Sequence, residues 1–197
     1  MRRIRRLFSY LLVLVTLMSC AGTRSAIEPP TLQRFQSYTM GTTVHITVVE
    51  SDTMEAARLA QVGGEAFAFV DSLMSNWTTT SEVARINREA GSKTLSIHPE
   101  VSEVLHFATQ VHAASNGAFD VTVEPLVRLW GFLDGKPKVP EAGAIEETLA
   151  RIGSQYLRHD PEARTLSFGI PNLRMDLGGI AKGYGVDRAW SAMEAHG

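Results

Sequence analysis

The sequence predicts an α+β protein, and three observations lead to this prediction. Residues 42–50, TTVHITVVE, alternate β-branched and polar side chains, which is the pattern of a strand. Residues 54–74 carry apolar side chains at the spacing of an amphipathic helix, which Gly63 and Gly64 weaken. Farther along the chain, helical and strand-like segments mix without the regular βαβ alternation of a parallel sheet.

Caps and apolar spacing predict four more helices. They are residues 82–87, capped by Thr80 or Ser81; residues 99–115, which begin at Pro99 and end near Asn116 and Gly117; residues 141–153, which end at Gly153; and residues 180–197. Residues 155–160 and 165–170 flank a turn signal and predict a hairpin. Residues 117–132 contain a β-favouring piece. Since no strand follows the last helix, we interpret the sequence as the N-terminal part of a protein truncated at its C-terminus.

The charge of the chain is unevenly distributed. Its 44% hydrophobic and 20% charged residues are ordinary for a globular protein. Four arginines, at positions 2, 3, 5 and 6, precede the first acidic residue, Glu28, and the rest of the chain holds 15 basic against 21 acidic residues. An acidic remainder offers no surface for a polyanion, so nucleic acid is not an expected partner.

The first 20 residues have the pattern of an export signal. A basic head precedes an apolar run, residues 7–18, that is too short to cross a bilayer as a helix. The signal ends at Cys20, the only cysteine. An ordinary secretory signal is one interpretation. We favour a bacterial lipoprotein signal with Cys20 lipidated, because a lone cysteine forms no disulfide and residues 21–34 resemble a tether. The protein is then exported and membrane-anchored, facing the periplasm or the cell exterior.

The stretch MDLGGIAKGYGVD, residues 175–187, is a candidate ligand site. It lacks the Gly-Lys-Ser/Thr order of a P-loop, and Arg188 stands where a Rossmann fingerprint needs a glycine. Its glycines nevertheless let a phosphate approach the start of a helix, where Lys182 adds a positive charge. Asp176 is suited to a polar ligand group or a metal. The alternative, which the pattern alone favours, is a helix start capped by Asp176 with Lys182 in solvent.

Two other stretches carry candidate residues. Trp77 lies in a polar loop, where an indole either stacks on a planar ring or covers the core. Asp120, in NGAFDVTVEP, is suited to a hydrogen-bonding role at a turn or a strand end. The six histidines show no metal-ligand spacing, and the sequence contains no nucleophile elbow of a hydrolase.

Four stretches in this order resemble the ApbE family of FAD:protein FMN transferases. They are residues 40–48, 74–87, 117–132 and 176–187. The resemblance implies that residues 35–197 are the N-terminal part of a T-fold-like flavin transferase domain. Such an enzyme uses Mg²⁺ to transfer the FMN moiety of FAD to a threonine hydroxyl of an acceptor flavoprotein, and it releases AMP. A lipid-anchored protein that stores FAD without transfer is the alternative.

The resemblance also assigns roles to individual residues. Those placed at the FAD are Met40, Trp77, Ala118, Phe119, Asp120, Asp176 and Lys182. Trp77 replaces a tyrosine that commonly stacks on the isoalloxazine, and an indole retains the flat face needed for this. The backbone carbonyl of Gly179 corresponds to a Mg²⁺ ligand. The family's remaining metal ligands and a catalytic histidine come from a later motif. No general base is therefore assigned, and the 197 residues alone are expected to be inactive.

Overall fold

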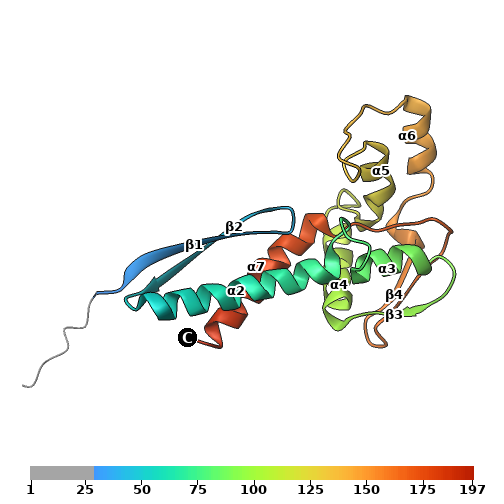
Figure 1. Cartoon of the computed structure of the whole chain (residues 1–197). Coiled ribbons are helices and arrows are strands. Elements are labelled where there is room, and N and C mark those ends of the chain that lie inside the picture. The colour runs from blue at the N-terminus through green and yellow to red at the C-terminus, as the bar shows by residue number, and fades with distance from the viewer. Residues whose placement is uncertain (1–28) are drawn as a thin grey trace, which may run out of the picture.

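The computed structural model describes residues 29–197, and it confirms the predicted α+β class (Figure 1). Its strands are β1 (Thr31–Thr39), β2 (Thr42–Glu50), β3 (Leu95–Ser96), β4 (Leu157–Asp160) and β5 (Thr165–Phe168). Its helices are α2 (Thr53–Met74), α3 (Glu82–Glu89), α4 (Pro99–Ala114), α5 (Glu124–Leu129), α6 (Ala142–Leu149) and α7 (Gly178–Glu194), with the 3-10 helices η1 (Val121–Val123) and η2 (Ser154–Tyr156). The predicted signal peptide with Cys20, and residues 21–28 of the predicted tether, lie outside the described residues.

Strands β1 and β2 form a long antiparallel hairpin beside α2. Met40 and Gly41 make its two-residue turn with φ angles of 52° and 69°. Positive φ at both central positions is the type I′ geometry, which matches the twist of the paired strands. Because β1 begins at Thr31, residues 31–34 form a strand where the sequence predicted the end of the tether.

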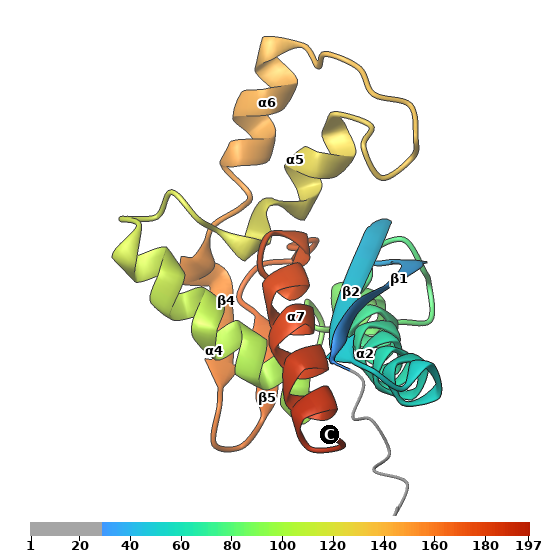
Figure 2. The same cartoon turned by 90° about the vertical axis from the view of Figure 1, so that its left-hand side faces the viewer.

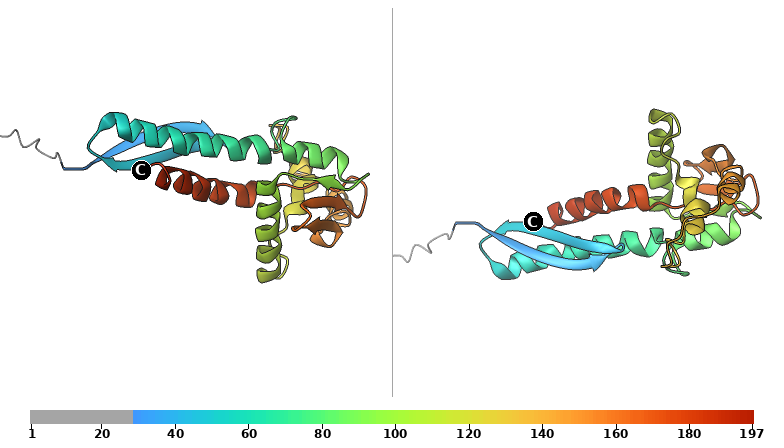
Figure 3. Two further views of the ribbon diagram at one scale, coloured as in Figure 1. Left: turned by 90° about the horizontal axis from the view of Figure 1, so that it is seen from below. Right: turned by 90° about the horizontal axis from the view of Figure 1, so that it is seen from above.

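Helices α2 and α7 lie side by side, with α7 between α2 and α4 (Figure 2). Figure 3 shows α4 running across the direction of these two helices. Two glycines permit the close approach of α2 and α7. A Cβ atom at Gly63 would lie 2.7 Å from Sδ of Met193, and one at Gly185 would lie 3.0 Å from the Phe67 ring and 3.2 Å from Sδ of Met40. The start of α7 is thereby held against the hairpin turn.

The main core lies between α3, α4, the start of α7 and an antiparallel sheet of order β3-β5-β4. The segment before α7 crosses this core in an extended conformation. Leu173, Met175 and Leu177 are almost fully buried, whereas Arg174 and Asp176 are partly exposed. This alternation is that of a strand, so Arg174 and Asp176 share the outward face. Within residues 29–197, none of the helices combines the length and the apolar character that crossing a membrane requires.

Most predicted elements are confirmed, but residues 117–132 differ from the prediction. Instead of a β-favouring piece, they contain η1 and α5. The Asp120 carboxylate accepts hydrogen bonds from the backbone N–H (2.8 Å) and the hydroxyl (2.6 Å) of Thr122, and Pro125 stands in the first turn of α5. These two local helix-starting features outweigh the β propensity of the valines. Helix α6 also ends at Leu149, earlier than the predicted Gly153.

Candidate functional site

Four of the predicted residues line one small hollow, which we call the Trp77 hollow. Met40 comes from the hairpin turn, Trp77 from the loop after α2, and Asp176 and Lys182 from the start of α7. The hollow has a volume of about 50 Å³. Its other lining residues are Asp71, Met74, Ser75, Asn76, Gly178 and Ala181. The fold thus brings together side chains from three distant parts of the chain.

Asp71 fixes Met40 in the Trp77 hollow. Oδ2 of Asp71 accepts a hydrogen bond from the Met40 backbone N–H (3.0 Å) and one from the Thr39 hydroxyl (3.3 Å). Asp71 was not predicted from the sequence. Asp71 lies in the last turn of α2, where the partial negative charge of the helix end disfavours an acidic side chain. Its unfavourable position was the sequence signal that it has a specific hydrogen-bond partner.

The Trp77 side chain is 66% exposed, so it does not cover the core. Its loop is ordered by local hydrogen bonds. The Trp77 backbone N–H donates to Oγ of Ser75 (3.2 Å), and the Ser81 hydroxyl donates to the Ser75 carbonyl (2.6 Å). Ser81 is also the N-cap of α3, as predicted. A rigid loop with an exposed indole provides a flat surface for a planar ligand.

The start of α7 presents both a carboxylate and an amine. Oδ1 of Asp176 accepts a hydrogen bond from the backbone N–H of Gly178 (2.6 Å), and the Asp176 N–H donates to the Val121 carbonyl (2.7 Å). Nζ of Lys182 lies 3.4 Å from the Gly178 carbonyl and is exposed. Asp176 is not the N-cap that the sequence suggested, because Leu177 holds that position. The Asp176 carboxylate binds the first N–H group of the helix and also lines the hollow.

Two asparagines that the sequence analysis missed hold Asp176 in place through its neighbour Met175. The buried Asn87 side chain donates to the Met175 carbonyl (2.9 Å) and accepts from the Met175 N–H (2.8 Å). It also donates to Oδ1 of Asn76 (3.1 Å), whose own amide donates to the same carbonyl (3.1 Å). Asn87 shares the buried face of α3 with Val83 and Ile86. A polar residue on an apolar helix face was the available signal.

The predicted residues Ala118, Phe119 and Asp120 lie outside the Trp77 hollow. Ala118 is exposed, and the Phe119 ring covers Gly179, where a Cβ atom would lie 3.1 Å from Cε2 of the ring. The Asp120 carboxylate also accepts a hydrogen bond from the Ser154 N–H (2.9 Å). Burial raises the pKa of Asp120, but the hydrogen bonds from Thr122 and Ser154 outweigh it and lower the pKa below its ordinary value. The hydrogen-bonding role predicted for Asp120 is confirmed.

The residues near Gly179 suit a metal that needs few protein ligands. Gly179 stands in the first turn of α7, and Asp176 lies two residues before the helix, so a backbone carbonyl and a carboxylate are close in the chain. Among residues 29–197, no cluster of three His, Cys, Asp or Glu side chains is arranged to hold a metal. Mg²⁺ characteristically uses one or two carboxylates together with substrate phosphates and water, so a complete protein cage is not required.

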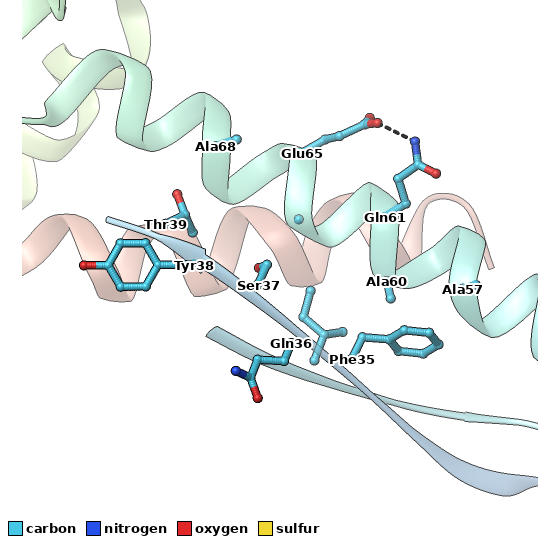
Figure 4. Close-up of a pocket in the computed structure, with 12 residues that line it drawn as sticks. Phe35, Gln36, Ser37, Tyr38, Thr39, Ala57, Ala60, Gln61, Glu65 and Ala68 are labelled. Atoms are coloured by element: carbon cyan, nitrogen blue, oxygen red, sulfur yellow. Dashed lines mark hydrogen bonds between the residues drawn. The ribbon is translucent and has the colours of Figure 1, made fainter. Parts of the chain in front are cut away.

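A larger hollow of about 510 Å³ lies between β1 and α2 (Figure 4). Its lining is mainly apolar, with Phe35, Ile46 and Ala60 among its members. Glu65 is its single charged residue and accepts a hydrogen bond from Gln61 (2.9 Å). Because this hollow offers no cation for a phosphate and no predicted residue, the Trp77 hollow is the candidate site despite its smaller volume.

The fold and the site define an α+β protein in which an exposed aromatic ring and a cationic helix start face one small hollow. The chain belongs to the ApbE family, whose pattern it matches over residues 40–197. It is 32% identical to an FAD:protein FMN transferase of Klebsiella pneumoniae, covering 93% of this chain and 54% of the relative. It is also 32% identical to one of Vibrio cholerae, covering 96% and 56%.

Solved structures show the same fold. The ApbE protein of Thermotoga maritima matches with a TM-score of 0.77 and 28% identity, over 84% of this chain and 53% of that one. The flavin transferase ApbE of Vibrio cholerae matches with a TM-score of 0.76 and 31% identity, over 85% and 54%. The chain therefore spans about half the length of the relatives that it matches.

Proposed function

We propose that this chain belongs to an enzyme that transfers the FMN moiety of FAD to a threonine of an acceptor flavoprotein and releases AMP. The observation that carries the proposal is the convergence of Met40, Trp77, Asp176 and Lys182 on one hollow. Relatives named FAD:protein FMN transferase support it independently.

The residues of the hollow suit two chemically distinct parts of FAD, the isoalloxazine ring and the diphosphate. The exposed Trp77 indole offers a face on which the isoalloxazine ring stacks, with Met40 beside it. Helix α7 has 17 residues, and the partial positive charge at its N-terminus adds to that of Lys182. An anionic diphosphate is therefore favoured at the start of α7, next to the stacked ring.

In the proposed reaction, the threonine Oγ forms a bond to the FMN phosphorus, and the bond from this phosphorus to the oxygen of the AMP phosphate breaks. The hydroxyl proton is lost to solvent or to a base, and no residue among 29–197 is assigned as that base. Bound Mg²⁺ would neutralise charge on the diphosphate, with the Gly179 carbonyl as one ligand. Lys182 stabilises the same developing charge, and Asn87 and Asp71 keep the hollow in position.

We also propose that the protein is exported and anchored in a bacterial membrane through a lipid on Cys20. The basic and apolar segments of residues 1–18 and the position of the single cysteine support this proposal. Palmitate labelling of the full-length protein in cells, compared with Cys20→Ser, tests the anchor. Equal labelling of the two proteins would contradict it.

The proposed activity is tested with the full-length protein, FAD, Mg²⁺ and an apo-acceptor that the Vibrio cholerae transferase flavinylates. Covalent flavin fluorescence on the denatured acceptor and stoichiometric AMP are expected, and both should disappear when the target threonine is changed to valine. The Vibrio cholerae enzyme serves as the positive control. Tight FAD binding without transfer or AMP would refute the transferase and support an FAD-storage protein.

A further inference from the structure

A second hollow lies next to the Trp77 hollow, beside the loop of residues 76–79. We call it the arginine hollow, because Arg88 of α3, Arg128 of α5 and Arg174 of the segment before α7 line it. Its volume is about 250 Å³, and Asn76 lines both hollows. None of the residues that the resemblance assigns to FAD or to Mg²⁺ lines the arginine hollow, so its cations need a separate explanation.

One buried carboxylate, that of Glu124, lies beside two of these three arginines. Glu124 is 1% exposed, and its Oε1 accepts hydrogen bonds from Nε (3.1 Å) and Nη2 (2.6 Å) of Arg128. Nη1 of Arg174 lies 4.0 Å from the same oxygen. Arg88 is held separately, since its Nη1 donates to the Thr79 carbonyl (2.8 Å). Three guanidinium groups and one carboxylate line the hollow, so its net charge is positive.

The hollow also has unused hydrogen-bonding capacity. Oε2 of Glu124 is buried and has no hydrogen-bond partner among the described residues. The Arg174 side chain is 39% exposed, and its Nη1 lies 4.0 Å from Oε1 of Glu124, which is beyond hydrogen-bond distance. A buried charged acceptor without a partner is unfavourable, so a ligand that supplies both an anion and an N–H donor would complement the hollow.

Arg174 lies close to the Trp77 hollow. Arg174 and Asp176 share the outward face of an extended segment, so their Cα atoms are about 7 Å apart, two residues along a strand. Asp176 lines the Trp77 hollow, and Arg174 lines the arginine hollow. A polypeptide that places a hydroxyl at the proposed FAD in the Trp77 hollow can therefore reach Arg174 with a side chain only a few residues away in its sequence.

We propose that the arginine hollow binds an acidic side chain of the acceptor protein, close in its sequence to the target threonine. This inference rests on the proposed function, because transfer to a protein requires a polypeptide to lie against the site. A carboxylate matches the fork of a guanidinium, and the backbone N–H groups of the same polypeptide can donate toward Glu124. A diphosphate has no donor to offer Glu124, and Lys182 already supplies a cation at the start of α7.

The test compares Arg174→Gln and Arg88→Gln in the full-length protein with Arg34→Gln. Arg34 is exposed on β1, a strand that Figure 1 shows well away from α5, and its substitution removes the same charge. For each variant, KM for the acceptor, the Kd for FAD and the NaCl dependence of kcat/KM are measured. Hexaglutamate is added as a competing anionic peptide, with hexaserine as its uncharged control.

We expect Arg174→Gln to raise the acceptor KM about tenfold or more, the loss of one charge-assisted contact, while the Kd for FAD changes less than twofold. Arg88→Gln should act in the same direction. The salt dependence of kcat/KM and the inhibition by hexaglutamate should both weaken in these variants, since both arise from opposite charges. Arg34→Gln should behave as the wild type does.

Three results would overturn the inference. If Arg174→Gln and Arg88→Gln match Arg34→Gln while the wild type transfers FMN, the proposed function stands and the arginine hollow does not bind the acceptor. If the two substitutions weaken FAD binding and leave the acceptor KM unchanged, the arginines belong to the FAD site. If the wild type transfers no FMN while the Vibrio cholerae enzyme does, the proposed function fails and the inference fails with it.

Discussion

Asn87→Ala should both destabilise the protein and weaken FAD binding. The substitution removes the acceptor of the buried Met175 N–H and one of the two donors to the Met175 carbonyl, and it also deprives Asn76 of a donor. Met175 is 0% exposed, so water cannot replace the lost partner of its N–H group. The unsatisfied Met175 N–H group and the weakened hydrogen-bond network should together lower the free energy of unfolding by about 2–4 kcal/mol.

Urea unfolding of the full-length protein measures this loss as a lower free energy of unfolding in water. Because Met175 precedes Asp176, the Kd for FAD should rise in parallel. Gln61→Ala is the matched control, since it also removes a side-chain amide that donates a hydrogen bond, but at an exposed position on α2. Its effect should stay within about 0.5 kcal/mol. If the two variants were equally stable, Asn87 would not be what holds the segment before α7.

Two further predictions concern α7. Gly185→Ala should lower the free energy of unfolding by about 1 kcal/mol, because the new methyl group would lie 3.0 Å from the Phe67 ring. Gly183→Ala, with no atom within 4 Å of its Cβ, should raise it by up to about 1 kcal/mol through helix propensity. Urea titrations that gave the same sign for both would contradict the close packing of α2 on α7. Burial, with hydrogen bonds to Glu100 and Glu103, raises the pKa of Tyr184 above its ordinary value of 10.0. The folded state then binds this proton more tightly than the unfolded state, and the resulting stability is complete below pH 10 and declines above it. Unfolding at pH 9 and pH 11 should show a decline that is smaller in Tyr184→Phe, and an equal decline would refute the assignment.

The long helices could be predicted because their signals are local. Ser81, the N-cap of α3, and Pro99, the first residue of α4, mark where these helices begin, and apolar spacing defines α2. Strand β1 was not predicted, because its nine residues become a strand by pairing with β2. The start of α5 was misread because one carboxylate, that of Asp120, and one proline outweigh a β-favouring sequence.

The residues that line the candidate site could be predicted from the sequence, but the residues that hold them in position could not. The glycine-rich start of α7 and the loop tryptophan are visible in the sequence, and the family resemblance unites them. Asp71 and Asn87 were missed because their partners are distant in the chain. Asp71 binds the backbone 31 residues earlier, and Asn87 binds it 88 residues later. Only the folded chain shows that these polar side chains position Met40 and Asp176.

The stacking of the flavin on Trp77 is the central element of the proposed site. The protein carries a natural control, because Trp77 and Trp190 are almost equally exposed, at 66% and 69%. The Kd for FAD should therefore be measured for the full-length wild type, Trp77→Ala and Trp190→Ala. Stacking on an aromatic side chain contributes about 1–3 kcal/mol, so Trp77→Ala should raise the Kd roughly 5- to 150-fold, while Trp190→Ala leaves it within about twofold. Equal effects of the two substitutions, or no FAD binding by the wild type, would contradict the stacking of the flavin on Trp77.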